Sequence, residues 1–444
     1  MTALTPTGDL LLAHGVSSRQ DLPLPFTYAL VGAVAALAVS FVALSVLWRE
    51  SRLRGDAAGS PLPAGEFLAS TEVRWALRVL GLLLVGFTAF AAVAGPDLAN
   101  NPTAGFVYVL FWVGLVPASL LFGPVWSWLN PLRTIHAVLV AVLGQDRDDP
   151  PFTMPDLLGY WPAALSLASF VWLELCAADR DSTGTLIAYF TVYAFVHVMA
   201  AVCFGEDWFA RCDGFEVFSR LIGRLSFFGR RDDGRLVVRS PLANLDGVPK
   251  APGLVAVLAV MLGSTAFDSV TSTPWWLDRT YDSSLSPAEL NSAALAGCIL
   301  AVAAAFCLAA VLAGVLSRQG PRGMGTEFAH SLVPIAMGYL IAHYFSLLIF
   351  AGQQAFINAS DPLANGSDLF GLADRQVDFG VLSATAISVV QVVSIVTGHV
   401  LGVFAAHDRS VRVFPRREAI VGQLPMMVLM VCYTLGGLSL LFAG

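Results

Sequence analysis

The chain has 444 residues, of which 56% are apolar and only 13% are charged, and its mean hydropathy is +0.71. A soluble globular protein has about 25% charged residues, so this composition excludes a soluble globule and indicates an integral membrane protein. The net charge of −7 and the restriction of basic residues to a few loops also argue against nucleic-acid binding.

Hydropathy along the chain predicts membrane-spanning helices. Bilayer hydrocarbon is about 30 Å thick and an α-helix rises about 1.5 Å per residue, so one span needs roughly 20 mostly apolar residues. Ten stretches meet this requirement: 26–48, 76–95, 105–122, 157–177, 184–204, 253–270, 292–316, 329–351, 379–406 and 424–443. We therefore expect an all-α, polytopic transmembrane helix bundle that forms one integral membrane domain over residues 1–444.

The basic residues predict the orientation of this bundle. Twenty lysine and arginine residues lie in one set of alternate loops and only four in the other set. Because such residues accumulate in cytoplasmic loops, both termini are expected to be extracytoplasmic. Residues 1–25 then form an extracytoplasmic tail, 205–252 a cytoplasmic loop, and 351–378 an acidic extracytoplasmic loop.

Two further apolar stretches, 124–143 and 205–228, predict helices at the membrane surface and not spans. In the first, Asn130-Pro131 breaks the helix and Arg133 would lie at membrane depth. In the second, apolar residues recur at roughly helical spacing between arginines. We expect two cytoplasmic interfacial amphipathic helices here, the second of them within the 205–252 loop.

These two stretches also match each other. The Phe-Gly pair at 122–123 and Trp126 recur as Phe-Gly at 204–205 and Trp208, at an offset of 82 residues. Either a parallel internal repeat or a chance match between apolar helices explains the similarity. Transporters are often built from such repeats, and their sites lie where the halves meet.

Polar side chains inside the apolar spans are the strongest functional candidates, because burying them in a bilayer is costly. Two layers are expected. The outer layer comprises Glu174, Asp268, His343 and Gln391, and the inner layer comprises His330, His399 and His407. The outer layer is interpreted as a proton relay or ligand site, or alternatively as interhelical hydrogen bonds that fix packing. For the inner histidines a structural interpretation is the alternative, because His330 and His407 lie at helix ends, where an exposed imidazole needs no functional explanation.

Metal ligands are predicted at two places outside the spans. His14 would become the N-terminal residue if a leader ended at Ala13, and its amine and ring could then chelate copper; a simple outward tail is the alternative. Asp361, Asp368 and Asp374 could gather a hard cation, although a solvated, turn-rich loop explains them equally. No cofactor follows from these patterns.

Motifs for nucleophilic or phosphate chemistry are missing from the sequence. It contains no G-x-S-x-G elbow, no H-E-x-x-H pair and no G-x-G-x-x-G loop, and its only lysine, Lys250, is not part of a Walker A motif. ATP-driven transport by this chain alone is therefore not expected.

Several stretches resemble a family of multi-pass bacterial membrane proteins commonly labelled "fenitrothion hydrolase". They begin at Phe111 (FWVGLV), Phe122 (FGPVW), Phe204 (FGEDW), Gly263 (GSTAFD), Ala342 (AHYFSLL) and Gly398 (GHV). The resemblance covers nearly the whole chain. It implies a bacterial, actinobacterial protein of the cytoplasmic membrane and hydrolysis of organophosphate esters, but it supplies no catalytic residues.

Three functional hypotheses follow. In the first, the protein transports a small solute or ion, with a site in the outer half of the bundle. In the second, it is a membrane-embedded hydrolase in which His343, assisted by Asp268 or Glu174, acts as base or metal ligand on an apolar ester. The third and minor one is copper handling. Transport requires a polar path between the two layers, whereas hydrolysis requires the three side chains around an open pocket.

Overall fold

The protein folds as a bundle of α-helices. The computed structural model describes residues 22–442 except residue 24 and residues 146–148 and 416–417. It is 73% helical, and in these described residues nine helices are long and apolar enough to cross a membrane. The predicted class of fold, a polytopic helix bundle, is thereby confirmed.

The nine spans are α2 (Phe26–Leu47), α4 (Thr71–Ala94), the π-helical η3 (Gly105–Val113) continued by α5 (Leu115–Phe122), α9 (Thr183–Phe204), α13 (Leu254–Thr271), α15 (Pro287–Leu316), α16 and α17 (Met324–Phe328 and Leu332–Ser360), α18 (Ala384–Val413) and α19 (Ala419–Leu441). The predicted stretch 157–177 forms α8 (Trp161–Cys176). Its 16 residues extend about 24 Å, less than the thickness of a bilayer.

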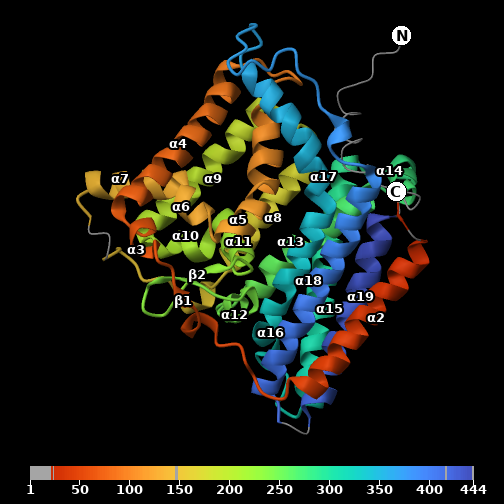
Figure 1. Ribbon diagram of the computed structural model, residues 1–444. Coiled ribbons are helices and arrows are strands. Elements are labelled where there is room, and N and C mark those ends of the chain that lie inside the picture. The colour runs from red at the N-terminus through yellow and green to blue at the C-terminus, as the bar shows by residue number, and fades with distance from the viewer. Residues whose placement is uncertain (1–21, 24, 146–148, 416–417, 443–444) are drawn as a thin grey trace.

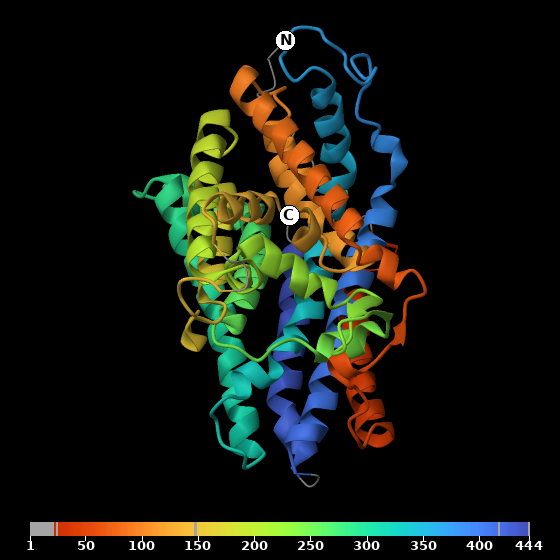
Figure 2. The same cartoon turned by 90° about the vertical axis from the view of Figure 1, so that its left-hand side faces the viewer.

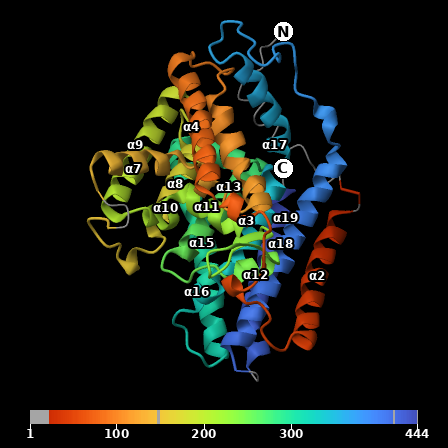
Figure 3. The same ribbon diagram turned by 60° about the vertical axis from the view of Figure 1, so that its left-hand side comes forward.

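Shorter helices complete the chain: α3 (Gly65–Leu68), α6 (Trp126–Leu129), α7 (Pro131–Val142), α10 (Asp207–Cys212), α11 (Gly214–Gly223), α12 (Pro241–Asp246) and α14 (Pro274–Asp282). Figures 1 and 3 show α4 to α11 gathered on one side of the molecule, and α2 with α13 to α19 on the other. Figure 2 shows the long helices of the second group running side by side.

Burial separates helices that face lipid from helices that form the centre. In α2, Val31, Val39 and Leu47 are each more than half exposed, which is favourable against hydrocarbon but not against water. Only 22% of the apolar window of α2 is buried, compared with 78% for α16 and α17 and 72% for α13. The polar side chains of α13 and α17 are therefore surrounded by protein.

The two stretches with the 82-residue offset have the same order of elements. α5 and α9 each end at a glycine with positive φ, Gly123 (92°) and Gly205 (82°), a conformation that favours glycine. Each glycine is followed by a short helix, then by a capping side chain, Asn130 or Asp213, and then by α7 or α11. This shared order supports the predicted internal repeat.

The two caps meet in the protein interior. Asn130 Nδ2 donates a hydrogen bond to Asp213 Oδ2 at 2.8 Å. Three residues after each cap, Arg133 pairs with Glu216, with Nε to Oε2 and Nη2 to Oε1 both at 2.7 Å. Both contacting pairs are 83 residues apart, one more than the 82-residue sequence match, and they join residues at the same place in the order of elements. All four side chains are buried.

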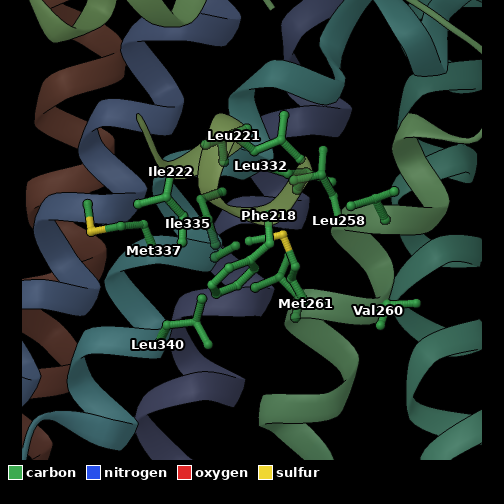
Figure 4. Packing of buried hydrophobic residues seen from close by; sticks show 14 of the residues in the cluster. Phe218, Leu221, Ile222, Leu258, Val260, Met261, Leu332, Ile335, Met337 and Leu340 are labelled. Carbon is green, nitrogen blue, oxygen red and sulfur yellow. The ribbon is translucent and has the colours of Figure 1, made fainter. Parts of the chain in front are cut away.

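The burial of α11 differs from the prediction of a membrane-surface helix over 205–228. Phe218 and Ile222 are fully buried, and Figure 4 shows them packed with Met261 of α13 and with Ile335 of α17. The apolar face of α11 is therefore covered by protein, and lipid does not reach it. The periodicity was correctly identified, but an apolar helical face packs equally well against helices and against a membrane. By contrast, α7 exposes Ile135, Val138 and Val142, as expected for an interfacial helix.

The rest of the predicted 205–252 loop forms a small sheet on the side of the basic loops. Strands β1 (Ser60–Pro61), β2 (Phe228–Arg230) and β3 (Leu236–Val238) lie antiparallel in the order β1-β3-β2. Arg239 is buried beside them and donates to Asp56 and to Asn244. This region is thus an ordered layer against the helix ends.

The Arg133–Glu216 pair generates a prediction about stability. Arg133→Gln leaves the buried carboxylate of Glu216 without its bidentate partner, and we expect the free energy of unfolding to fall by about 3–5 kcal/mol. Arg220→Gln is the matched control, because Arg220 Nε also contacts Glu216, at 2.9 Å, but its side chain is 42% exposed. Its loss should cost less than about 1 kcal/mol. Unfolding of both variants in one detergent measures the difference; equal losses would contradict this account.

Candidate functional site

The close packing of α17 and α18 sets the depth of the candidate residues. A Cβ atom at Gly398 would lie 2.4 Å from the carbonyl oxygen of Pro334, and one at Gly338 would lie 2.4 Å from that of Ser394. Only glycine permits such an approach. Because the two helices are antiparallel, this register places Gln391 at the level of His343, as the sequence predicts. Both side chains are buried.

His343 and Asp268 form a buried pair between α17 and α13. His343 Nε2 lies 2.9 Å from Asp268 Oδ2, and the side chains are 5% and 10% exposed. Tyr344 donates its hydroxyl hydrogen to the same carboxylate oxygen at 2.8 Å. The structure therefore brings together two of the three predicted catalytic candidates, and it adds a tyrosine.

A chain of hydroxyl groups continues from the other nitrogen of His343. Ser269 Oγ lies 3.2 Å from His343 Nδ1 and 2.9 Å from the hydroxyl of Tyr339. The same Oγ also lies 3.1 Å from the carbonyl oxygen of Thr265, to which it can donate. Ser269 is 1% exposed, so protein atoms and not solvent surround its hydroxyl group.

Two hydrogen-bond arrangements satisfy these atoms, and they differ by one proton. In the first, Ser269 donates to Thr265, His343 Nδ1 donates to Ser269, and a second proton lies between His343 Nε2 and Asp268 Oδ2. In the second, His343 Nδ1 has lost its proton and accepts one from Ser269 instead. Rotation of a single hydroxyl group therefore accommodates loss of a proton from the pair.

Glu174 lies at the C-terminal end of α8, near this pair. Its carboxylate interacts electrostatically with Asp268. Its Oε2 atom is buried and has no hydrogen-bond partner among the described residues. Glu174 is thus close enough to Asp268 for the two carboxylates to interact, and Asp268 is the one that contacts the imidazole of His343.

A small cavity with mostly apolar walls borders one residue of the hydroxyl chain and one of the inner layer. It has a volume of about 140 Å³ and is lined by both Tyr339 and His399. His399 Nδ1 donates to the carbonyl oxygen of Ile395 at 2.8 Å, which leaves Nε2 as the acceptor of a neutral ring. This Nε2 is buried, and it has no hydrogen-bond partner in the described part of the chain. His399 is therefore the inner-layer residue best placed to receive a proton.

The other inner histidines have different surroundings. His407 lies between two acceptors, Gln423 Oε1 and the carbonyl oxygen of Trp48, both at 2.8 Å. Through these hydrogen bonds, His407 of α18 connects the end of α2 with α19. His330 is buried at the start of α17, near Arg409. Neither lines the 140 Å³ cavity.

The predicted metal ligands are not gathered. Backbone N–H groups of residues 365–367 donate to Asp361 and hold its pKa below the usual range. The Ser360 hydroxyl and the backbone do the same to the pKa of Asp368. Among the described residues no group of three or more His, Cys, Asp or Glu side chains, Asp374 included, could hold a metal ion. His14 lies outside the described residues.

Two larger cavities lie away from the His343–Asp268 pair. One of about 820 Å³ has apolar walls from α4, η3, α5 and α9. The other, about 780 Å³, lies on the side of the basic loops. Neither of these two, nor the 140 Å³ cavity, is lined by His343, Asp268 or Glu174.

Comparison of the chain with protein-family models, with curated proteins and with solved structures gave no match. The function is therefore inferred from the geometry of the site.

Sequence reasoning missed three members of this site: Ser269, Tyr339 and Tyr344. Two of them adjoin predicted residues, and Tyr339 precedes His343 by four positions, which places both on one helix face. This four-residue spacing was the feature of the sequence that could have predicted Tyr339 as a neighbour of His343. Hydroxyl side chains are common in membrane helices, however, and they bond to backbone carbonyls of their own helix, so the pattern alone is not specific.

The hydrogen bond from Tyr344 to Asp268 can be tested by its contribution to stability. Tyr344→Phe removes a donor to a buried charged group, and we expect a loss of about 1.5–3 kcal/mol. Tyr433→Phe removes a hydroxyl that donates to the carbonyl oxygen of Val302 at 2.8 Å, and this neutral bond should contribute only about 0.5–1.5 kcal/mol. Unfolding in one detergent compares the two; a larger loss for Tyr433→Phe would contradict the assignment.

Proposed function

We propose that the protein is a proton-coupled transporter of a small solute or ion, with the proton bound by the His343–Asp268 pair. The observation that carries this proposal is the hydrogen-bonded series that joins the buried pair to Ser269 and Tyr339. Tyr339 also lines a mostly apolar cavity that His399 lines from the inner layer. Buried ionisable groups in membrane helices are typical of proton relays.

Charge balance supplies the coupling. With its extra proton, the pair combines an imidazolium and a carboxylate and has no net charge. Without that proton it carries one negative charge, which is costly in an enclosed bundle. The cost falls if a cation or a strong hydrogen-bond donor takes the place of the proton beside Asp268 and Glu174. The proposed solute is therefore cationic or rich in donors.

The predicted topology gives this transport a direction. We propose that the protein lies in the bacterial cytoplasmic membrane with its basic loops in the cytoplasm. The His343–Asp268 pair then exchanges protons nearer the outer face, and His399 lies nearer the cytoplasm. The positive-inside bias of the loops supports this orientation.

Proton flux into proteoliposomes tests the proposal. With valinomycin, an imposed pH gradient and a series of small organic cations on the opposite side of the membrane, wild-type protein should carry protons faster than empty liposomes for at least one cation, as followed by an internal pH dye. Asp268→Asn should reduce the flux to that of empty liposomes, because the pair no longer binds an exchangeable proton. Tyr339→Phe should slow it, since the hydroxyl chain is broken.

Matched controls separate this effect from general damage to the bundle. Ser264→Ala removes a buried hydroxyl of α13 that bonds only within its own helix. Tyr433→Phe removes a hydroxyl beside the same 140 Å³ cavity. Both should keep the wild-type flux. Wild-type flux equal to that of empty liposomes, or unchanged flux in Asp268→Asn, would overturn the proposal.

Ester hydrolysis is the second candidate function, and one observation favours it. Ser269, His343 and Asp268 are hydrogen-bonded in series, which is the order of a nucleophile, a base and the residue that orients the base. Two observations weigh against it. Ser269 can donate its proton to Thr265, away from the base, and it lines none of the three cavities.

A fluorophosphonate probe distinguishes the two functions, because it labels an activated serine. Wild-type protein in lipid should remain unlabelled under the transport proposal, since Ser269 is enclosed. Labelling that disappears in Ser269→Ala, followed by mass spectrometry of the peptide, would favour hydrolysis instead.

A further inference from the structure

The 780 Å³ cavity lies on the side of the basic loops, between the start of α4, the helices α6, α10 and α11, and the β2–β3 hairpin. Its volume is in the range of small-molecule sites, about 300–1,000 Å³. It is separate from the His343–Asp268 pair, and the proposed transport does not use it.

The charges of this cavity are strongly unbalanced. Six arginines line it, against two carboxylates, Asp56 and Asp232. The six are Arg74, Arg211, Arg220, Arg224, Arg230 and Arg231. This concentration is unusual for a chain whose net charge is −7. Like charges lining one concave surface repel each other, so the arrangement favours binding of an anion.

Internal ion pairs neutralise only half of these arginines. Arg224 pairs with Asp56, Arg220 with Glu216, and Arg231 with Asp233. Asp56 is also bonded to Arg239, so it has little charge left to compensate others.

The remaining three, Arg74, Arg211 and Arg230, have no carboxylate partner among the described residues. All three side chains belong to exposed residues, so a ligand can reach them. Planar guanidinium groups match phosphate oxygens in pairs of parallel hydrogen bonds.

Apolar side chains also line the cavity. They include Leu77 of α4, Phe122 at the end of α5 and Trp128 of α6. A tryptophan and a phenylalanine at the end of a membrane helix are typical of the interface between hydrocarbon and headgroups. The cavity therefore offers both cationic groups and apolar contacts to a ligand.

We propose that this cavity binds a phosphate-bearing ligand, whose phosphate contacts Arg74, Arg211 and Arg230. The phosphate belongs either to the headgroup of an anionic phospholipid or to a soluble phosphate compound. The apolar side chains of Leu77 and Trp128 accommodate the acyl chains in the first case.

Two binding arms distinguish these sources. In the lipid arm, detergent-purified protein receives phosphatidylglycerol or, for comparison, uncharged diacylglycerol, and native mass spectrometry counts the lipids retained. In the soluble arm it receives inorganic pyrophosphate, and the shift of the unfolding midpoint gives the affinity. The wild-type protein should bind the phosphate-bearing compound of at least one arm and should not retain diacylglycerol.

The variants identify the cavity as the site. Arg74→Gln with Arg211→Gln should weaken that binding at least about tenfold, because two charge-assisted contacts are lost. Arg322→Gln is the control: Arg322 is an exposed arginine of a basic loop that does not line the cavity. The midpoint without ligand checks that the variants fold. Absence of binding in both arms, or equal binding by the double variant and the wild type, would overturn the proposal.

Discussion

The buried hydrogen-bonded pair of His343 and Asp268 is the constraint on which the central part of the bundle depends. Neither group can be left alone inside a membrane protein, because an unpaired buried charge costs several kcal/mol. The protein meets this requirement by enclosing both in its two most buried spans and by adding the hydroxyls of Tyr344 and Ser269. The close contact at Gly338 and Gly398 then holds α18 against the same layer. The helix contacts that pack this part of the bundle therefore also hold its polar side chains in place.

The other side of the molecule supports this arrangement through α11. Its end is held by the buried Arg133–Glu216 pair and by the contact between the two helix caps, and its apolar face packs on α13 and α17. The helices that carry the His343–Asp268 pair therefore pack against the second of the repeat-like stretches through α11.

Hydropathy predicted the spans well, because a bilayer imposes length and composition on every helix that crosses it. The same physical argument identified His343, Asp268 and Glu174, since ionisable groups in apolar segments are rare. It did not find the burial of α11, because periodicity does not tell whether lipid or protein covers an apolar face. Nor did it find Ser269 and Tyr339, whose role depends on which neighbouring helix their hydroxyls face. Asp361 and Asp368 were suggested as cation ligands, but their loop uses them to bind its own backbone N–H groups.

The central claim is that the His343–Asp268 pair holds one exchangeable proton, and nitrogen NMR of histidine measures it directly. Protein labelled with ¹⁵N-histidine in lipid, with His343→Gln to assign the signal, reports the protonation of Nδ1 and Nε2 separately. The account predicts that the Nε2 signal of His343 shows a hydrogen bond to Asp268 and that Asp268→Asn changes this signal, while the Nδ1 signal continues to show the contact with Ser269. An Nε2 signal that is the same in the wild type and in Asp268→Asn would contradict it.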